Sequence, residues 1–331
     1  MANQRPYRLG IMFRREYGPE TLPAFARKAE AAGFDELWVV EDCFYTSGIA
    51  AAATALAVTE SITIGLGIMP AVVRNPVFTA MEIATLCRLF PGRFLPGIGH
   101  GVAEWMRQIG AMPKSQLTAL EEVTFTVGEL LAEKEVSLDG QYVHLEGAKL
   151  VHPPAAAPPV SLGVIGPKSL QLAGRAAGGT ILSEFSSPAY VAWAKEQIEQ
   201  GQAEAGRTDP HRLTLFTFAA AAPTTDAARA RVRPLVAEAI ASGDIDPKLA
   251  PLGILEEARR MTKRGGRAGV EAEMPDEWID RMTIAGTPRD WQAAMERLVA
   301  GGVHSVILTP LPDAPLDEID AFAAHVREIA G

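Results

Sequence analysis

The sequence predicts an α/β protein built on a (β/α)₈ (TIM) barrel with insertions. Two observations support this fold class: short apolar runs of strand length recur eight times, and segments with helical spacing of apolar residues separate them. Because continuous apolar runs are typical of strands buried on both faces, the sheet should be parallel and connected by helical crossovers. Eight such units close naturally into a barrel, and 331 residues with 48% apolar content are enough for one. An open, doubly wound sheet is the rival architecture.

The β/α units can be followed in order along the chain. In the first unit, an apolar run at 8–13 is followed by Leu22, Phe25 and Ala29 at helical spacing, ending near Gly33. The predicted strands are 8–13, 34–41, 62–69, 93–99, 159–164, 180–183, 213–222 and 303–311. The predicted helices are 22–33, 50–58, 77–90, 115–132, 167–177, 188–205, 226–241, 288–300 and 316–329.

Two segments interrupt this alternation. Residues 136–150 contain Asp139 and Gly140 between two runs of alternating polarity, which predicts a β-hairpin insertion. Residues 242–282 are polar and rich in glycine and arginine, without clear strand character, so we expect a long excursion from the barrel there. We expect both segments to belong to one domain spanning residues 1–331.

Composition and charge narrow the range of partners. The chain has 31 basic and 40 acidic residues, a net charge of −9, and no dense basic block, so nucleic acid is not an expected partner. Its apolar runs are shorter than the ~20 residues that a membrane-spanning helix needs, and no membrane association is expected. The first ten residues lack the organisation of a signal peptide, and only two cysteines are present. We therefore expect a cytoplasmic protein that acts on a small molecule.

Two hydrolase classes are disfavoured by missing motifs. The six histidines are scattered, without HExxH or clustered Cys/His spacing, so no metal site is expected. The GxSxG motif of serine hydrolases is absent as well.

Candidate functional residues follow the predicted strands, because barrel enzymes carry their chemistry at the carboxyl ends of strands. The third strand ends with Gly67, Ile68 and Met69. Gly67 lies seven residues before Arg74, the first residue of an Arg-Asn-Pro helix start. After the fourth strand, Gly99 and His100 belong to a Gly-x-Gly-x-Gly segment whose glycines let backbone approach a flat ring closely. We expect the next helix to start well downstream, which argues against a dinucleotide-binding fingerprint.

The fifth strand is followed by a predicted anion site. Ile165, Gly166, Pro167 and Lys168 form the start of a helix, where free N–H groups and a positive partial charge favour a phosphate. Ser183, at the end of the sixth strand, should lie near this site.

Taken together and in this order, these strand ends resemble the luciferase-like family, most closely its members that use the deazaflavin coenzyme F420. The resemblance extends from Leu9 to Leu311. It implies a reduced flavin or deazaflavin at the barrel mouth, a cis peptide bond between Gly67 and Ile68 behind its ring, and its phosphate at residues 165–168. It also implies a homodimer formed through helices of the first half, such as residues 79–90.

The second strand end departs from the family pattern. Many relatives place a histidine where this chain has Cys43, so the usual catalytic base is in question. Glu41, Asp42 and Cys43 are predicted to contact the ring, and a carboxylate in a partly closed mouth can have a raised pKa and donate a proton. His100 could exchange a proton near neutral pH. Cys43 is a candidate too, although a small apolar filler is the simpler reading of it.

The resemblance implies an oxidoreductase that transfers a hydride between F420 and a small organic substrate. The alternatives are an FMN-dependent monooxygenase that uses reduced FMN and oxygen, and a flavin-binding barrel without catalysis. A phosphate-binding aldolase or isomerase is disfavoured, because Lys168 lies too near the anion site to act as its lysine. The substrate itself is not indicated by any pattern.

Overall fold

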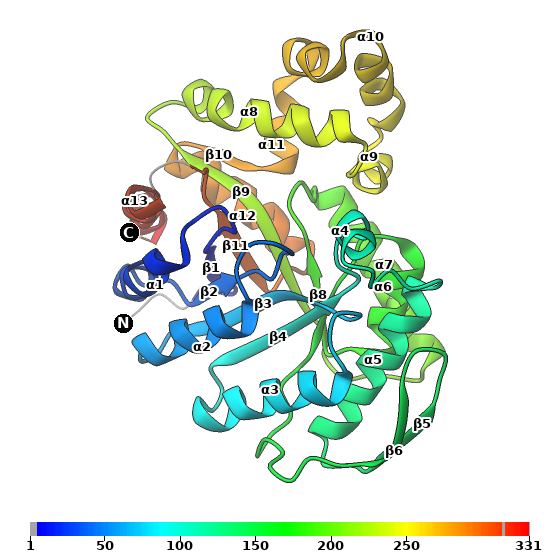
Figure 1. The fold of residues 1–331 in the computed structure, drawn as a ribbon. Helices are drawn as coiled ribbons and strands as arrows, with labels where there is room; N and C mark the ends of the chain where they lie inside the picture. The colour runs from blue at the N-terminus through cyan, green and yellow to red at the C-terminus, as the bar shows by residue number, and fades with distance from the viewer. Residues whose placement is uncertain (1–4, 313–314, 331) are drawn as a thin grey trace.

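The computed structural model describes residues 5–312 and 315–330, and these form a closed parallel barrel (Figure 1). Its strands run in the order β1-β2-β3-β4-β7-β8-β9-β11, and the pairing of β11 with β1 closes the ring. The barrel strands are β1 (Arg8–Met12), β2 (Glu36–Val39), β3 (Thr63–Pro70), β4 (Phe94–Gly99), β7 (Ser161–Gly163), β8 (Gly179–Leu182), β9 (Arg212–Ala221) and β11 (Ser305–Thr309). The closed ring confirms the predicted fold class and excludes the open sheet.

Helices surround this barrel and begin mostly where the sequence places capping residues. The side chains of Ser47, Asn75 and Ser115 each accept a hydrogen bond from a first-turn N–H, which satisfies a group that the helix itself leaves free. The outer helices are α1 (Leu22–Ala31), α2 (Gly48–Val58), α3 (Pro76–Leu89), α5 (Gln116–Leu131), α6 (Pro167–Ala176), α7 (Pro188–Glu204), α8 (Thr225–Ser242), α12 (Pro288–Ala300) and α13 (Pro315–Ala330), with a 3-10 turn at Pro19–Thr21 before α1.

Outside the excursion 242–282, a short helix and a short strand were not predicted. Helix α4 (Ala103–Gln108) starts two residues after Gly101, so the expectation that the next helix begins well downstream was wrong. Strand β10 (Ile284–Gly286) pairs with the far end of β9. Six and three residues are too few to establish a hydrophobic period, which is why pattern analysis missed both.

The segment 136–150 contains two antiparallel strands, β5 (Val136–Asp139) and β6 (His144–Ala148). A carboxylate from α5 holds their connection: Glu122 accepts N–H groups of Gln141, Tyr142 and Val143 at 2.7, 2.8 and 3.0 Å. The hairpin lies low in Figure 1, next to α5.

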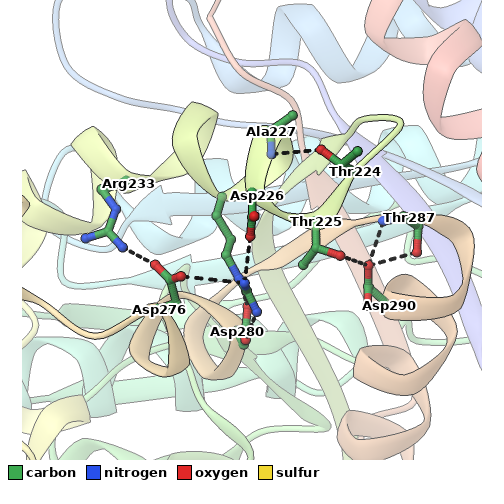
Figure 2. Close-up of polar contacts among 10 residues, drawn as sticks. Thr224, Thr225, Asp226, Ala227, Arg233, Asp276, Asp280, Thr287 and Asp290 are labelled. Carbon is green, nitrogen blue, oxygen red and sulfur yellow. Dashed lines mark hydrogen bonds and ion pairs between the residues drawn. The ribbon is translucent and has the colours of Figure 1, made fainter.

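The excursion 242–282 is helical. It contains α9 (Asp246–Leu252), α10 (Leu255–Glu273) and α11 (Asp276–Met282), which gather around α8 at the top of Figure 1. Figure 2 shows Arg233 of α8 paired with Asp276 of α11, and Asp290 of α12 accepting from the hydroxyl of Thr225 at 2.8 Å. These contacts attach the excursion and α8 to the outer wall of the barrel.

The barrel interior is filled below its mouth. Met12, Trp38, Ile181, Phe216 and Ile307 form a buried cluster inside the ring of strands. This cluster is the floor on which the site at the carboxyl ends of the strands is built. In the part of the chain that is described, no helix has the length and apolarity needed to cross a membrane.

Candidate active site

A cavity of about 520 Å³ opens at the carboxyl ends of the barrel strands. Every one of the eight barrel strands, or the loop that follows it, contributes to its wall. Its volume lies in the range typical of small-molecule sites, and its position is the one at which barrel enzymes carry their chemistry.

The cavity brings together nine of the thirteen residues that the sequence singled out. Those in its wall are Glu41, Asp42, Cys43, Gly67, Ile68, His100, Ile165, Gly166 and Ser183. Met69 and Gly99 are buried in strands outside this lining, and Pro167 and Lys168 are exposed at the start of α6 beside it.

Ile68 forms a distinct part of the wall. Its peptide bond with Gly67 is cis, as the family resemblance implied. A Cβ added at Gly163 would lie 2.4 Å from Ile68 Cγ2, and one at Gly99 would lie 3.0 Å from Ile68 Cδ1. Gly97 is in similar contact, at 3.3 Å from Ile68 Cγ2. A Cβ at Gly97 would also lie 2.6 Å from the Leu66 carbonyl oxygen, and one at Gly99 would lie 2.7 Å from the Gly163 carbonyl oxygen, so these glycines make room for the neighbouring strands as well as for Ile68.

Below Ile68 the cavity is apolar. Phe216 and Ile181 of the barrel interior form its floor, and Phe218 adds a further aromatic wall. A flat, largely apolar ring would replace water against this surface at a favourable free energy.

The opposite end of the cavity is the start of α6. Gly166 is the N-cap residue, with extended φ and ψ of −82° and 159°, and no side chain of the helix caps the first-turn N–H groups. A Cβ at Gly166 would meet no atom within 4 Å, and Gly166 lines the cavity, so the helix start faces open space at this residue. The residues present here fit a bound phosphate.

His100 belongs to this anion end. Its Nε2 lies 2.9 Å from the hydroxyl of Ser169, which stands in the first turn of α6 and also lines the cavity. Burial lowers the pKa of His100, so its ring is neutral at pH 7. The sequence pointed to His100 but not to Ser169, because the two meet only through the pairing of β4 with β7.

Three hydrogen bonds fix the position of the Glu41 carboxylate. Arg74 donates two hydrogen bonds to its carboxylate, at 2.7 and 3.0 Å, and the N–H of Gly48 donates a third at 2.9 Å. The Glu41 carboxylate thus fixes the start of α2 against the loop before α3, and its remaining capacity to bind a ligand is small.

Asp42 and Cys43 differ from Glu41 in their surroundings. Burial raises the pKa of Asp42, while the guanidinium of Arg15, at 2.9 Å, partly offsets the rise. Burial, together with the charges of Asp42 and Glu41, raises the pKa of the Cys43 thiol as well. Cys43 therefore stays a protonated thiol at neutral pH, and the raised pKa of Asp42 favours its protonated form more than a fully exposed aspartate would.

The loop after β1 supplies a charged cluster whose pairings the sequence could not reveal. Glu16 accepts from Arg14 at 3.0 Å and from Arg15 at 3.2 Å. The Arg15 guanidinium stacks over the rings of Tyr45 and Trp105, at 5.2 and 5.4 Å from their centroids. Arg14, Arg15, Glu16 and Trp105 of this cluster line the cavity and form its outer wall.

Lys248 also lies near the site and, like Ser169, was not predicted from the sequence. It lies in α9, within the excursion, and its Nζ reaches the backbone and side-chain oxygens of Ser183. No motif marks it, because nothing in a polar, helical segment distinguishes the one lysine that points inward. Among the described residues, no cluster of three or more metal-ligating side chains occurs.

Comparisons with known proteins show the family and the fold of the chain. The family model described as luciferase-like monooxygenase matches residues 8–305. The 5,10-methylenetetrahydromethanopterin reductase of Methanolobus tindarius is 30% identical over 290 residues, covering 86% of this chain and 88% of that one. The reductase of the same name from Archaeoglobus fulgidus is 30% identical over 312 residues, covering 91% and 92%.

The fold also matches a solved structure. The coenzyme F420-dependent tetrahydromethanopterin reductase of Methanopyrus kandleri superposes with a TM-score of 0.82 at 24% identity, over 98% of this chain and 99% of that one. At this identity the likeness shows the fold. The family match over nearly the whole described barrel, with the cavity at its carboxyl end, places this chain in the luciferase-like monooxygenase family of F420- or flavin-dependent oxidoreductases.

Proposed function

We propose that this protein transfers a hydride between coenzyme F420 and a small organic substrate. The observation that carries the proposal is that one cavity joins an apolar wall at Ile68 and Phe216 to an open helix start at Gly166. A ring with a phosphate-bearing side chain needs both ends. The F420-dependent tetrahydromethanopterin reductase that shares this fold and the F420-dependent glucose-6-phosphate dehydrogenases among the similar proteins support F420 over FMN as the cofactor.

In this proposal the bound deazaflavin supplies the hydride chemistry, and the chain orients it, limits water and manages protons. Ile68 backs the ring, and Gly166 with Ser169 receives the phosphate. Asp42 is the group we assign to proton exchange, because burial raises its pKa and it faces the cavity. His100, paired with Ser169, supports the phosphate end.

The substrate is expected between the ring and the outer wall. That wall carries Arg14, Arg15 and Trp105, and its charges are internally paired. A neutral substrate with polar groups at its edge suits such a wall, because it leaves these pairs intact.

The test is a pair of titrations of cofactor-free protein, one with F420 and one with FMN, followed by fluorescence quenching. Micromolar binding of F420 with much weaker binding of FMN is the expected result. The reverse order would move the protein to the FMN-dependent monooxygenases, and binding of neither would refute a cofactor role for the cavity. Binding of F420 without its reduction or oxidation by any of a panel of alcohols, aldehydes and imines would favour a non-catalytic barrel.

Two further properties are proposed with this function. Phe78, Met81 and Leu89 of α3 are exposed, as is Phe125 of the neighbouring α5, and we propose that this face forms a homodimer. Both cysteines are free thiols, Cys43 and Cys87, in keeping with a cytoplasmic location.

A further inference from the structure

Lys248 is an unusual residue for an insertion helix. Its exposure is 2%, although lysine is rarely buried to this degree without partners. It stands in α9, outside the barrel, yet its side chain reaches the turn that follows barrel strand β8.

The ammonium group is fully partnered in that turn. Lys248 Nζ donates to the carbonyl oxygen of Ser183 at 3.0 Å, to the Ser183 hydroxyl at 2.7 Å and to the carbonyl oxygen of Glu184. These three acceptors match the three N–H donors of an ammonium. The ring of Tyr190 lies beneath, with its centroid 5.9 Å from Nζ.

The turn needs such a donor. Between β8 and α7 the chain passes through Phe185, whose φ of 64° is in the left-handed region that a bulky residue seldom adopts. The carbonyl groups of Ser183 and Glu184 lie beyond the end of the β8 ladder and take their partners from side chains. The hydroxyl of Ser186 donates to the Ser183 carbonyl at 2.7 Å from within the turn, and Lys248 donates to both carbonyls from a different part of the chain.

The same turn is part of the cavity wall. Ser183 and Glu184 both line the cavity, and the Glu184 carboxylate accepts from the hydroxyl of Thr309 at 3.2 Å. Beside them, the Tyr190 hydroxyl donates to the carbonyl of Ile165 at 2.8 Å, in the loop at the anion end. Lys248 and the Tyr190 ring therefore lie directly behind the loops that follow the neighbouring strands β7 and β8.

We propose that Lys248 is a positioning residue: its ammonium holds the turn at Ser183 and Glu184, and so sets where these two side chains stand in the cofactor cavity. The excursion thereby contributes to the site without lining it. Burial lowers the pKa of Lys248 to about 7, while the charge of Glu184 opposes the change. A neutral amine keeps two N–H donors for the two carbonyls and can accept from the Ser183 hydroxyl, so the contact survives in either state.

The role of the turn in binding rests on the proposed cofactor function, so the experiment has one measurement that needs no cofactor. Lys248→Met keeps the length and apolar volume of the side chain and removes its donors, and Lys248→Gln keeps N–H donors on a shorter chain. The matched control is Asp246→Asn, which breaks the 2.8 Å ion pair of α9 with Arg259 but leaves the turn untouched. Hydrogen exchange of residues 183–187 is measured in the cofactor-free proteins, and affinity for F420 by fluorescence titration.

We expect Lys248→Met to raise exchange selectively at 183–187 and to weaken F420 binding about 10-fold, with Lys248→Gln in between and Asp246→Asn like the wild type. A uniform rise in exchange across the barrel with unchanged F420 affinity would overturn the proposal, since it would mean a general stabilising role. Unchanged exchange at 183–187 in Lys248→Met would overturn it too. If Lys248→Met does not fold, Lys248→Gln alone decides by the same two measurements. Wild-type protein that binds neither F420 nor FMN would refute the proposed function, and the exchange result would still decide whether Lys248 holds the turn.

Discussion

Ile68 shows how glycines act on the site indirectly. Its side chain occupies space that Gly97, Gly99 and Gly163 leave free on two neighbouring strands, and Gly163 approaches it most closely. The shape of the cavity therefore depends on the missing side chains of these glycines, of which Gly163 lines the cavity and Gly97 and Gly99 do not.

A single methyl group tests this arrangement. In Gly163→Ala the new Cβ would lie 2.4 Å from Ile68 Cγ2. The Ile68 side chain already fills the space beside Gly97 and Gly99, so we expect it to shift into the cavity. We expect F420 binding to weaken about 10-fold in a fluorescence titration, with the fold retained by circular dichroism. Gly128→Ala in α5 is the control, because its Cβ would meet nothing within 4 Å and it should bind F420 normally. Wild-type affinity in Gly163→Ala would contradict this role of Ile68.

A second residue-scale prediction concerns pH. Burial lowers the pKa of His211 to about 4, and its Nε2 lies 2.8 Å from the hydroxyl of buried Thr180. Because the folded pKa is below the unfolded value of about 6.5, only the unfolded chain takes up this proton between pH 6.5 and 4, so stability falls as the pH falls through that window. The titration is worth on the order of 3 kcal/mol.

Urea unfolding of the wild type and of His211→Gln at pH 7, 5.5 and 4.5 measures this effect. The glutamine variant cannot titrate, and its loss of stability over this window should be smaller by a large part of that amount. Equal pH dependence in the two proteins would show that His211 is not the group responsible.

At the scale of elements, one side chain connects the hairpin to the barrel. Glu122 of α5 accepts three consecutive N–H groups from residues 141–143 at the turn between β5 and β6, and these bonds, with His144 nearby, lower its pKa although burial opposes them. Two short strands are only marginally stable by themselves, so we infer that this contact keeps the hairpin formed.

Glu122→Ala should therefore loosen the hairpin. We expect faster hydrogen exchange at 141–143 and a loss of about 1 to 3 kcal/mol in the free energy of unfolding, because three N–H groups lose a charged acceptor. Glu121→Ala is the matched control, since the neighbouring carboxylate makes only a 3.7 Å ion pair with Arg175. Identical exchange in the two variants would refute the assignment.

At the scale of the whole molecule, the exposed face of α3 and α5 determines our expectation for assembly. Phe78, Met81 and Leu89 are 60%, 47% and 65% exposed, and their spacing along α3 places them on one face of that helix. We also propose that the excursion and the barrel form one domain. A single unfolding transition in calorimetry would support this proposal.

Charge on this face should separate the protomers. We expect the double variant Phe78→Glu, Met81→Glu to be monomeric in sedimentation velocity at micromolar concentration. Dimer formation would bury the two new carboxylates in the interface without positively charged partners. Leu316→Glu, at an exposed position of α13, which packs on α1, α12 and β9, should stay dimeric. A monomeric wild type would exclude the proposed interface.

Local sequence patterns predicted the order of the barrel strands, the hairpin within residues 136–150, and most of the strand ends that form the cavity, although the connection of the hairpin spans residues 140–143 and Asp139 belongs to β5. These features depend on patterns within about ten neighbouring residues, and the closed barrel brings the ends of its strands to one mouth whatever their side chains are. Only the tertiary structure decided that Arg74 binds Glu41, that Ser169 meets His100 and that Lys248 reaches Ser183. Each of these contacts joins residues far apart in the chain, and it depends on the direction in which a side chain points after the strands have paired, which no local pattern records.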